Sequence, residues 1–242
     1  RLADSVAAWL FGLQHCCDGP VGVSMKTDKV VLLTGFEPFG GETINPSQRI
    51  VEALAGLEID GHRIVGRVMP VAFAPCECLI AQWIDELDPV LVIGLGQAGG
   101  RSELSLERIA VNLIDARICD NDGSQPVDVP VMAGEAAGLF ASVPLKRILL
   151  ALHDAGIPAA ISQSAGTYVC NQVFFLTASC LAKSDNPGRG GFIHVPWLPE
   201  QSVNHPGQPS MALATMIEGV RVAITTSLAH DADISLAAGT TH

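Results

Sequence analysis

The sequence is poor in positive charge and has no long apolar run. Lys and Arg number 14 against 25 Asp and Glu, which gives the 242-residue chain a net charge of −11 at neutral pH. An acidic chain is a poor match for the phosphates of a nucleic acid or for an anionic membrane surface. No apolar stretch approaches the ~20 residues that a membrane-spanning helix needs. We therefore expect neither nucleic acid nor membrane as a partner.

The cysteines do not form the pattern of a disulfide scaffold. The seven cysteines are odd in number and scattered, whereas a secreted disulfide scaffold is shorter and denser in Cys. Cys76 and Cys78 are not half of a zinc site, because no second pair follows at finger spacing. We interpret Cys76, Cys78, Cys119 and Cys180 as ordinary thiols, and we expect a cytoplasmic protein with no metal site.

The first 24 residues differ from the rest of the chain. Met25 stands just before the first clear strand, and the apolar patch 6–13 is too short for a signal sequence and has no small-residue cleavage site. We therefore treat residues 1–24 as an extension or an expression remnant that is poorly ordered. Residues 25–242 are predicted to form a single α/β domain.

Short apolar segments alternate with amphipathic ones along this domain. Strands are predicted over residues 30–34, 63–71, 89–94, 109–114, 159–162 and 191–195, and helices over 46–55, 75–87, 145–155, 168–182 and 210–228. Apolar strands joined by helices favour a mostly parallel sheet covered on both faces, with its site at the carboxyl ends of the strands. Residues 115–130 are predicted to be a polar loop, and the tail after His230 is expected to fray.

Gly94, Gly96 and Gly99 match the G-x-G-x-x-G pattern of dinucleotide-binding proteins. In that motif a helix must open at the last glycine, so that its amide groups hold the pyrophosphate. The charged stretch from Arg101 leaves little room for such a helix before Ile109. A nucleotide-binding Rossmann-like protein stays open as an alternative to the hypothesis that follows.

Cys170 and His194 are the residues with the clearest chemical potential. Cys170 follows a turn of small residues at the predicted start of a helix, where the amide ends lower the pKa of a thiol. His194 lies on the next strand and could act as its base. Either residue alone is more often part of a core, but both belong to elements expected to end at one edge of the sheet. Together they suggest a cysteine hydrolase.

Two further segments accept both a structural and a functional interpretation. Phe36 and Phe39 lie in a Gly- and Pro-rich loop, where they could anchor the loop or form the apolar wall of a pocket. Glu107 taken alone is most simply a solvated surface charge. The nearby cluster Arg101, Arg108 and Arg117 could orient a carboxylate or stabilise negative charge.

Five motifs, taken in order, resemble the pyroglutamyl peptidase I family of cysteine peptidases, also called pyrrolidone-carboxylate peptidases. The resemblance runs from about residue 29 to residue 224 and rests on TGFEPFGG (34–41), GQAGGR (96–101), ERIAVNLIDARI (107–118), AGTYVCN (165–171) and FIHVP (192–196). The chain departs from the usual family pattern at Tyr168, where many members carry Phe.

The resemblance implies a fold, an activity and a set of site residues. The fold is a three-layer α/β/α sandwich, assembled as a homotetramer, and the activity is the removal of an amino-terminal pyroglutamyl residue from peptides without metal or cofactor. Cys170 becomes the nucleophile, His194 the base and Glu107 the third catalytic residue. The implied substrate-binding residues are Phe36, Phe39, Gln97, Arg117, Ile118, Tyr168 and Val169. A catalytically silent homologue that acts as a binding module is the second alternative.

Overall fold

The structure is a computed structural model that describes residues 29–185 and 187–239. The predicted extension, residues 1–24, lies outside the described residues. Within the described part of the chain, no helix combines the length and the apolar character needed to cross a membrane.

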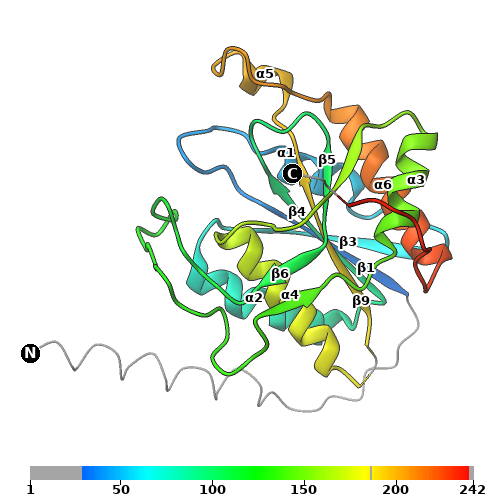
Figure 1. Ribbon diagram of the computed structural model, residues 1–242, viewed down its shortest axis with the longest axis horizontal. Coiled ribbons are helices and arrows are strands. Elements are labelled where there is room, and N and C mark those ends of the chain that lie inside the picture. Colours follow the sequence, from blue (N-terminus) through cyan, green and yellow to red (C-terminus); the bar gives the residue numbers. More distant parts are fainter. Residues whose placement is uncertain (1–28, 186, 240–242) are drawn as a thin grey trace, which may run out of the picture.

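A seven-stranded sheet forms the centre of the molecule (Figure 1). Its strands, in spatial order, are β2 (Glu58–Ile59), β3 (His62–Met69), β1 (Val30–Phe36), β4 (Leu91–Gln97), β9 (Arg189–Val195), β5 (Leu104–Glu107) and β8 (Ala159–Ser162). A separate pair is formed by β6 (Ile109–Val111) and β7 (Gly138–Phe140). The predicted α/β fold with a mostly parallel sheet is confirmed.

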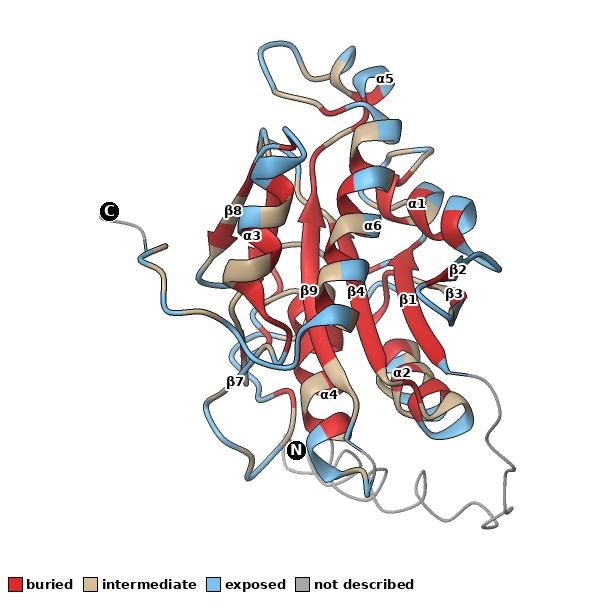
Figure 2. Ribbon diagram, turned by 90° about the vertical axis from the view of Figure 1, so that its right-hand side faces the viewer, coloured by how far each residue is buried: buried red, intermediate tan, exposed pale blue. Residues whose placement is uncertain are grey.

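Helices cover both faces of the sheet, which makes three layers. The helices are α1 (Pro46–Leu54), α2 (Phe73–Leu87), α3 (Leu145–Asp154), α4 (Val169–Lys183), the short α5 (Pro199–Ser202) and α6 (Leu213–Ala229). One apolar cluster joins the sheet to α1, α3 and α6, and another joins it to α2 and α4. Buried residues fill the strands, whereas exposed residues lie on the outer sides of the helices and on the loops (Figure 2).

The loop between β1 and α1 is closed by the helix cap that the sequence predicts. The Asn45 side chain accepts a hydrogen bond from the Ser47 amide at 3.0 Å, and Pro46 takes the first helical position. Gly56 follows the helix with φ of 82°, a conformation that suits glycine. The loop that carries Phe39 therefore enters α1 at a defined point.

Strand β5 was not predicted, and it changes the geometry of the sheet. It pairs antiparallel with β9 and parallel with β8, so β5 and β8 run against the other long strands. The expectation that the site-bearing strands all end at one edge is therefore wrong. Because β5 and β8 have only four residues each, they instead end beside the middle of β9, level with Phe192.

The segment after α6 is also better anchored than the sequence predicts. The Asp233 carboxylate accepts hydrogen bonds from the backbone amides of Lys146 and Arg147, at 3.0 and 3.1 Å. These amides open α3, whose own N-cap residue, Pro144, supplies no side-chain bond. The expectation of a frayed tail is wrong for this part of it, because an unsatisfied helix end provides its partner.

Candidate active site

Cys170 lies in the first turn of α4, against a glycine of the central sheet. The Cys170 sulfur lies 2.8 Å, and His194 Cδ2 3.1 Å, from the point where a β carbon on Gly96 would stand. Gly96 and His194 are register partners on β4 and β9. The absent side chain at position 96 therefore leaves room for both the sulfur and the imidazole on the same side of β4.

The third predicted residue completes a chain of polar contacts. Glu107 Oε1 lies 2.7 Å from Nδ1 of His194. Both side chains are buried, and that of Glu107 has no exposed surface. The interpretation of Glu107 as a solvated surface charge is therefore wrong, because β5 runs inside the sheet between β9 and β8. With Nδ1 engaged by the carboxylate, Nε2 of His194 is the nitrogen that is free to exchange protons.

Arg101 extends this chain toward solvent. Its guanidinium donates a hydrogen bond of 2.8 Å to the same oxygen, Oε1 of Glu107, and its side chain is 34% exposed. Of the three arginines considered from the sequence, Arg101 is the one that contacts the Glu107 carboxylate. Arg117 is exposed on the 115–130 loop and makes no hydrogen bond or ion pair with the described residues.

The surroundings of Glu107 keep it ionised. Burial alone would raise the pKa of its carboxyl, but the hydrogen bond and charge of His194, together with the hydrogen bond from Arg101, hold the pKa below its usual value. As the pH falls through this lowered pKa, Glu107 becomes neutral and can no longer stabilise a positive imidazole.

The pKa of the nucleophile moves opposite to the sequence-based prediction. Burial raises the pKa of the Cys170 thiol to about 12, and the opposing effect of the Arg101 charge is smaller. The direction is opposite to the lowering predicted at the helix start, because desolvation of a thiolate outweighs the backbone hydrogen bond and the Arg101 charge that favour it. Burial therefore favours the thiol form of Cys170.

Aromatic and aliphatic side chains lie around the start of α4. Phe36 and Val169 are buried in the cluster that contacts α2 and α4, and Phe39 and Tyr168 pack against that cluster. The Phe39 and Tyr168 rings lie 6.5 Å apart, and the Tyr168 hydroxyl donates to the Cys119 carbonyl oxygen at 3.0 Å. Ile118, the neighbour of Cys119, is half-buried. The structure thus gathers predicted pocket residues from the end of β1, the loop after it and the start of α4, and the Tyr168 hydrogen bond joins the loop that carries Ile118 to them.

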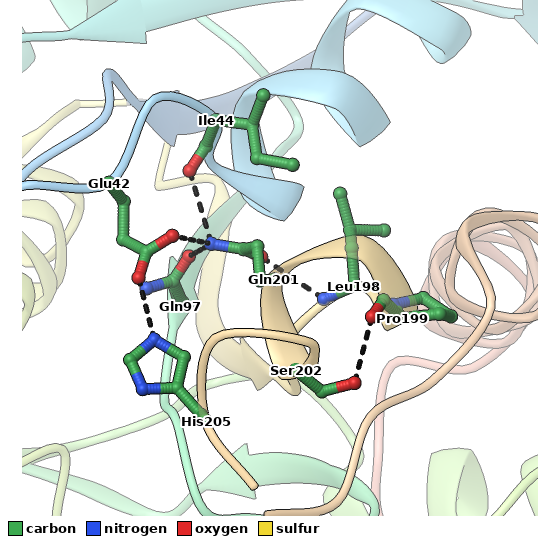
Figure 3. Close-up of polar contacts among 8 residues, drawn as sticks. All are labelled: Glu42, Ile44, Gln97, Leu198, Pro199, Gln201, Ser202 and His205. Atoms are coloured by element: carbon green, nitrogen blue, oxygen red, sulfur yellow. Dashed lines mark hydrogen bonds and ion pairs between the residues drawn. The ribbon is translucent and has the colours of Figure 1, made fainter.

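Gln97 closes β4 and belongs to a polar cluster that sequence analysis missed. Its Oε1 accepts a hydrogen bond of 2.9 Å from Nε2 of Gln201, which lies on α5. Glu42 and His205 belong to the same cluster (Figure 3). No local pattern in the sequence could link Gln97 with Gln201, because the two are separated by 104 positions.

The glycine pattern 94–99 has a packing explanation, and the nucleotide-binding alternative is wrong. No helix opens after Gly99; the next element is β5. A β carbon on Gly94 would stand 2.5 Å from the Phe192 ring, and one on Gly99 would stand 2.3 Å from the Trp197 ring. These glycines admit neighbouring side chains rather than phosphates.

A cavity of about 340 Å³ lies elsewhere, between β7, the start of α3 and the tail near Asp233. None of the three catalytic candidates lines this cavity. The candidate site is therefore identified from the chemistry of its side chains and not from the size of a cavity. Within the residues that the structure describes, no three His, Cys, Asp or Glu side chains gather in a way that could hold a metal ion.

Comparison with known proteins agrees with this geometry. A family model described as pyroglutamyl peptidase matches residues 29–230. A pyrrolidone-carboxylate peptidase of Erwinia tasmaniensis is 50% identical over 214 residues, which are 88% of this chain and 100% of that protein. One of Klebsiella pneumoniae is 49% identical over 212 residues, which are 88% of this chain and 99% of that protein.

Solved structures show the same similarity. The pyroglutamyl peptidase I of Bacillus amyloliquefaciens is 40% identical, with a TM-score of 0.83 over 87% of this chain and 100% of that chain. A mutant pyrrolidone carboxyl peptidase of Pyrococcus furiosus is 45% identical, with a TM-score of 0.81 over 83% of this chain and 98% of that chain.

Proposed function

The chain belongs to the pyroglutamyl peptidase family, and from this premise we propose that it is a cysteine exopeptidase that releases pyroglutamate from the amino terminus of peptides. The observation that carries the proposal is the buried Glu107–His194 pair, with the Cys170 sulfur against the same glycine as the imidazole. A nucleophile, a base and a group that orients the base are the three parts that covalent catalysis of acyl transfer requires.

The reaction begins with proton transfer from the Cys170 thiol to Nε2 of His194. The thiolate then attacks the carbonyl carbon of the pyroglutamyl residue, and Glu107 stabilises the imidazolium through Nδ1. When the tetrahedral intermediate collapses, His194 gives the proton to the leaving amine and a thioester remains on Cys170. Water, activated by His194, hydrolyses the thioester, releases pyroglutamate and restores the thiol.

The first turn of α4 is suited to stabilise the oxyanion of the intermediate. Tyr168, the N-cap residue, makes no side-chain hydrogen bond to the helix, so amides of the first turn stay available. Backbone donors directed at a developing oxyanion contribute about 3 kcal/mol each to catalysis. Arg117, which the family resemblance places beside the nucleophile, could add charge only if the exposed loop that carries it turns inward on binding.

The pocket explains why a lactam ring would be selected. Pyroglutamate has a neutral lactam in place of an ammonium group, so its ring needs an apolar slot with a few polar contacts. Phe36, Phe39, Ile118, Tyr168 and Val169 would provide the apolar surface, and backbone groups of Gln97 and of the neighbouring loops would provide the polar contacts. A proline ring lacks the lactam oxygen, which would leave a buried donor without a partner at a cost of about 1–3 kcal/mol.

The proposal is tested with pyroglutamyl amides of a fluorescent amine. Cys170→Ala should lower kcat about 10⁴-fold or more, whereas Cys180→Ala, a matched change further along α4, should leave it unaltered. Glu107→Gln should lose less activity than His194→Ala, because the amide still orients the ring. Full activity in Cys170→Ala would refute the proposed nucleophile. A wild-type protein that binds pyroglutamyl peptides without cleaving them would instead be the silent binding module.

Assembly, location and the domain division are further proposals. The family resemblance supports a homotetramer, which sedimentation at several protein concentrations would test. A reducing cytoplasm is supported by Cys76, Cys119 and Cys170, which carry free thiols. We retain a single domain over residues 25–242, because the two apolar clusters share one sheet.

A further inference from the structure

The buried carboxylate of Glu107 takes both of its contacts on one oxygen. Nδ1 of His194 lies 2.7 Å, and the Arg101 guanidinium 2.8 Å, from Oε1 of Glu107. The other oxygen, Oε2, is buried and has no hydrogen-bond partner among the described residues. Ser162, the register partner of Glu107 on β8, directs its hydroxyl to the Ser164 carbonyl oxygen instead. The position of the carboxylate is therefore set by two donors, of which only the imidazole takes part in the proposed reaction.

Arg101 is the one Lys or Arg that pairs with Glu107 in the described part of the chain. In the proposed reaction His194 is neutral until it takes the proton of Cys170, whereas a guanidinium is charged at every working pH. The Glu107 side chain has no exposed surface, and a carboxylate buried without a counter-charge is costly and tends to take up a proton. Arg101 is thus the positive charge that balances Glu107 before an imidazolium forms.

The loop after β4 is folded so that Arg101 reaches this carboxylate. Gly100 has φ of 86°, a backbone conformation that suits glycine. A β carbon on Gly99 would stand 2.3 Å from the Trp197 ring, so this ring packs directly on the backbone of the loop. Trp197 in turn stacks on His205, with 3.9 Å between the ring centroids. Arg101 therefore extends from a loop that is held in place, and because its side chain is 34% exposed, the fold should tolerate a substitution there.

We propose that Arg101 is a positioning residue, which holds Oε1 of Glu107 on the imidazole and supplies the positive charge that this buried carboxylate needs before His194 carries one. The inference rests on the proposed function, which makes Glu107 and His194 catalytic. The other titratable groups that act on Glu107 are His194 on β9 and Cys170 on α4, and β8 carries none. Without Arg101, the Glu107 carboxylate takes up a proton at a higher pH, and a neutral carboxyl group stabilises an imidazolium less.

The kinetic test compares Arg101→Met with Arg108→Met, which removes the same charge from a side chain that lines the separate cavity. Arg101→Met should lower kcat for the pyroglutamyl amide about tenfold, with KM within about twofold, because Arg101 acts on the base and not on the bound ring. The acid limb of kcat/KM should move to higher pH, and Arg101→Lys, which keeps a charge, should restore it most of the way. An unmoved acid limb in Arg101→Met, or an equal shift in Arg108→Met, would overturn the inference.

A second measurement follows the carboxyl group itself and needs no turnover. In protein with ¹³C-labelled glutamate, the Glu107 carboxyl signal, assigned with Glu107→Gln, should titrate below the usual pH range of Glu in wild type and in Arg108→Met. In Arg101→Met the same signal should titrate at higher pH. Identical titrations of Glu107 in Arg101→Met and wild type would contradict the role of Arg101. A wild-type protein that cleaves no pyroglutamyl amide would refute the proposed function, while the titration would still decide whether Arg101 supplies the counter-charge.

Discussion

At the scale of single residues, two opposing effects act on the pKa of the Cys170 thiol. The first turn of a helix stabilises a thiolate, but burial removes the water that would solvate it, and burial dominates with a pKa of about 12. In the proposed reaction, His194 therefore generates the thiolate when the substrate is bound, and no ion pair is stored beforehand.

Alkylation at a series of pH values shows whether the pKa of the Cys170 thiol is raised or lowered. Because only the thiolate reacts, the alkylation rate of Cys170 should keep rising about tenfold per pH unit well above pH 9. A short cysteine peptide, whose thiol titrates near ~8.5, should level off above that pH. Labelling with iodoacetamide, followed by mass spectrometry of the Cys170 peptide, gives the two profiles. A Cys170 rate that levels off below pH 7 would mean that the pKa is lowered after all.

At the scale of elements, β4 serves both the core and the site through two glycines. A β carbon on Gly94 would meet the buried Phe192 ring at 2.5 Å, whereas one on Gly96 would stand 2.8 Å from the Cys170 sulfur. The strand approaches a neighbouring side chain closely at both positions, but only at Gly96 is that side chain the proposed nucleophile, Cys170.

Gly96→Ala should therefore lose catalytic activity, whereas Gly94→Ala should lose stability. Gly96→Ala displaces the sulfur, and a displacement on the order of 1 Å can lower kcat/KM about 100-fold. Gly94→Ala overpacks the core, which should destabilise the fold by about 1–3 kcal/mol while the folded fraction stays active. Kinetics and thermal melting of both variants separate the two effects. Wild-type kcat/KM in Gly96→Ala would contradict the close approach of sulfur and sheet.

Whole elements differed in how well the sequence could predict them. Helix α1 was predictable because Asn45, Pro46 and Gly56 act locally at its ends. Strand β5 was not, because its four residues lie in a charged stretch, and its place between β9 and β8 is set by distant parts of the chain.

At the scale of the whole molecule, the segment after α6 returns to cap a helix on the same face of the sheet. Asp233 satisfies two amides of α3 that no neighbouring residue satisfies, and Arg147 binds the Ala232 carbonyl oxygen in return. These contacts between the tail and α3 do not involve the proposed catalytic residues, so they should contribute to stability alone.

Asp233→Ala should accordingly lower the free energy of unfolding by about 1 kcal/mol, the usual effect of losing a cap. For a domain of this size that corresponds to a fall in Tm of about 2–4 °C, with kcat and KM unchanged. Asp231→Ala is the matched control, because the Asp231 side chain is 98% exposed and should have little effect. Equal melting temperatures for Asp233→Ala and wild type would show that the tail does not cap α3.

The sequence by itself determined the alternation of strands and helices, the capped entry to α1 and the identities of the sulfur and the imidazole, because these depend on local periodicity and on side-chain chemistry. Only the tertiary structure decided that β5 runs inside the sheet, that Glu107 is buried against His194, that burial raises the pKa of Cys170 and that Gln201 donates a hydrogen bond to Gln97. These properties depend on solvent exclusion and on contacts between residues far apart in the chain, and neither is encoded in any short stretch of it.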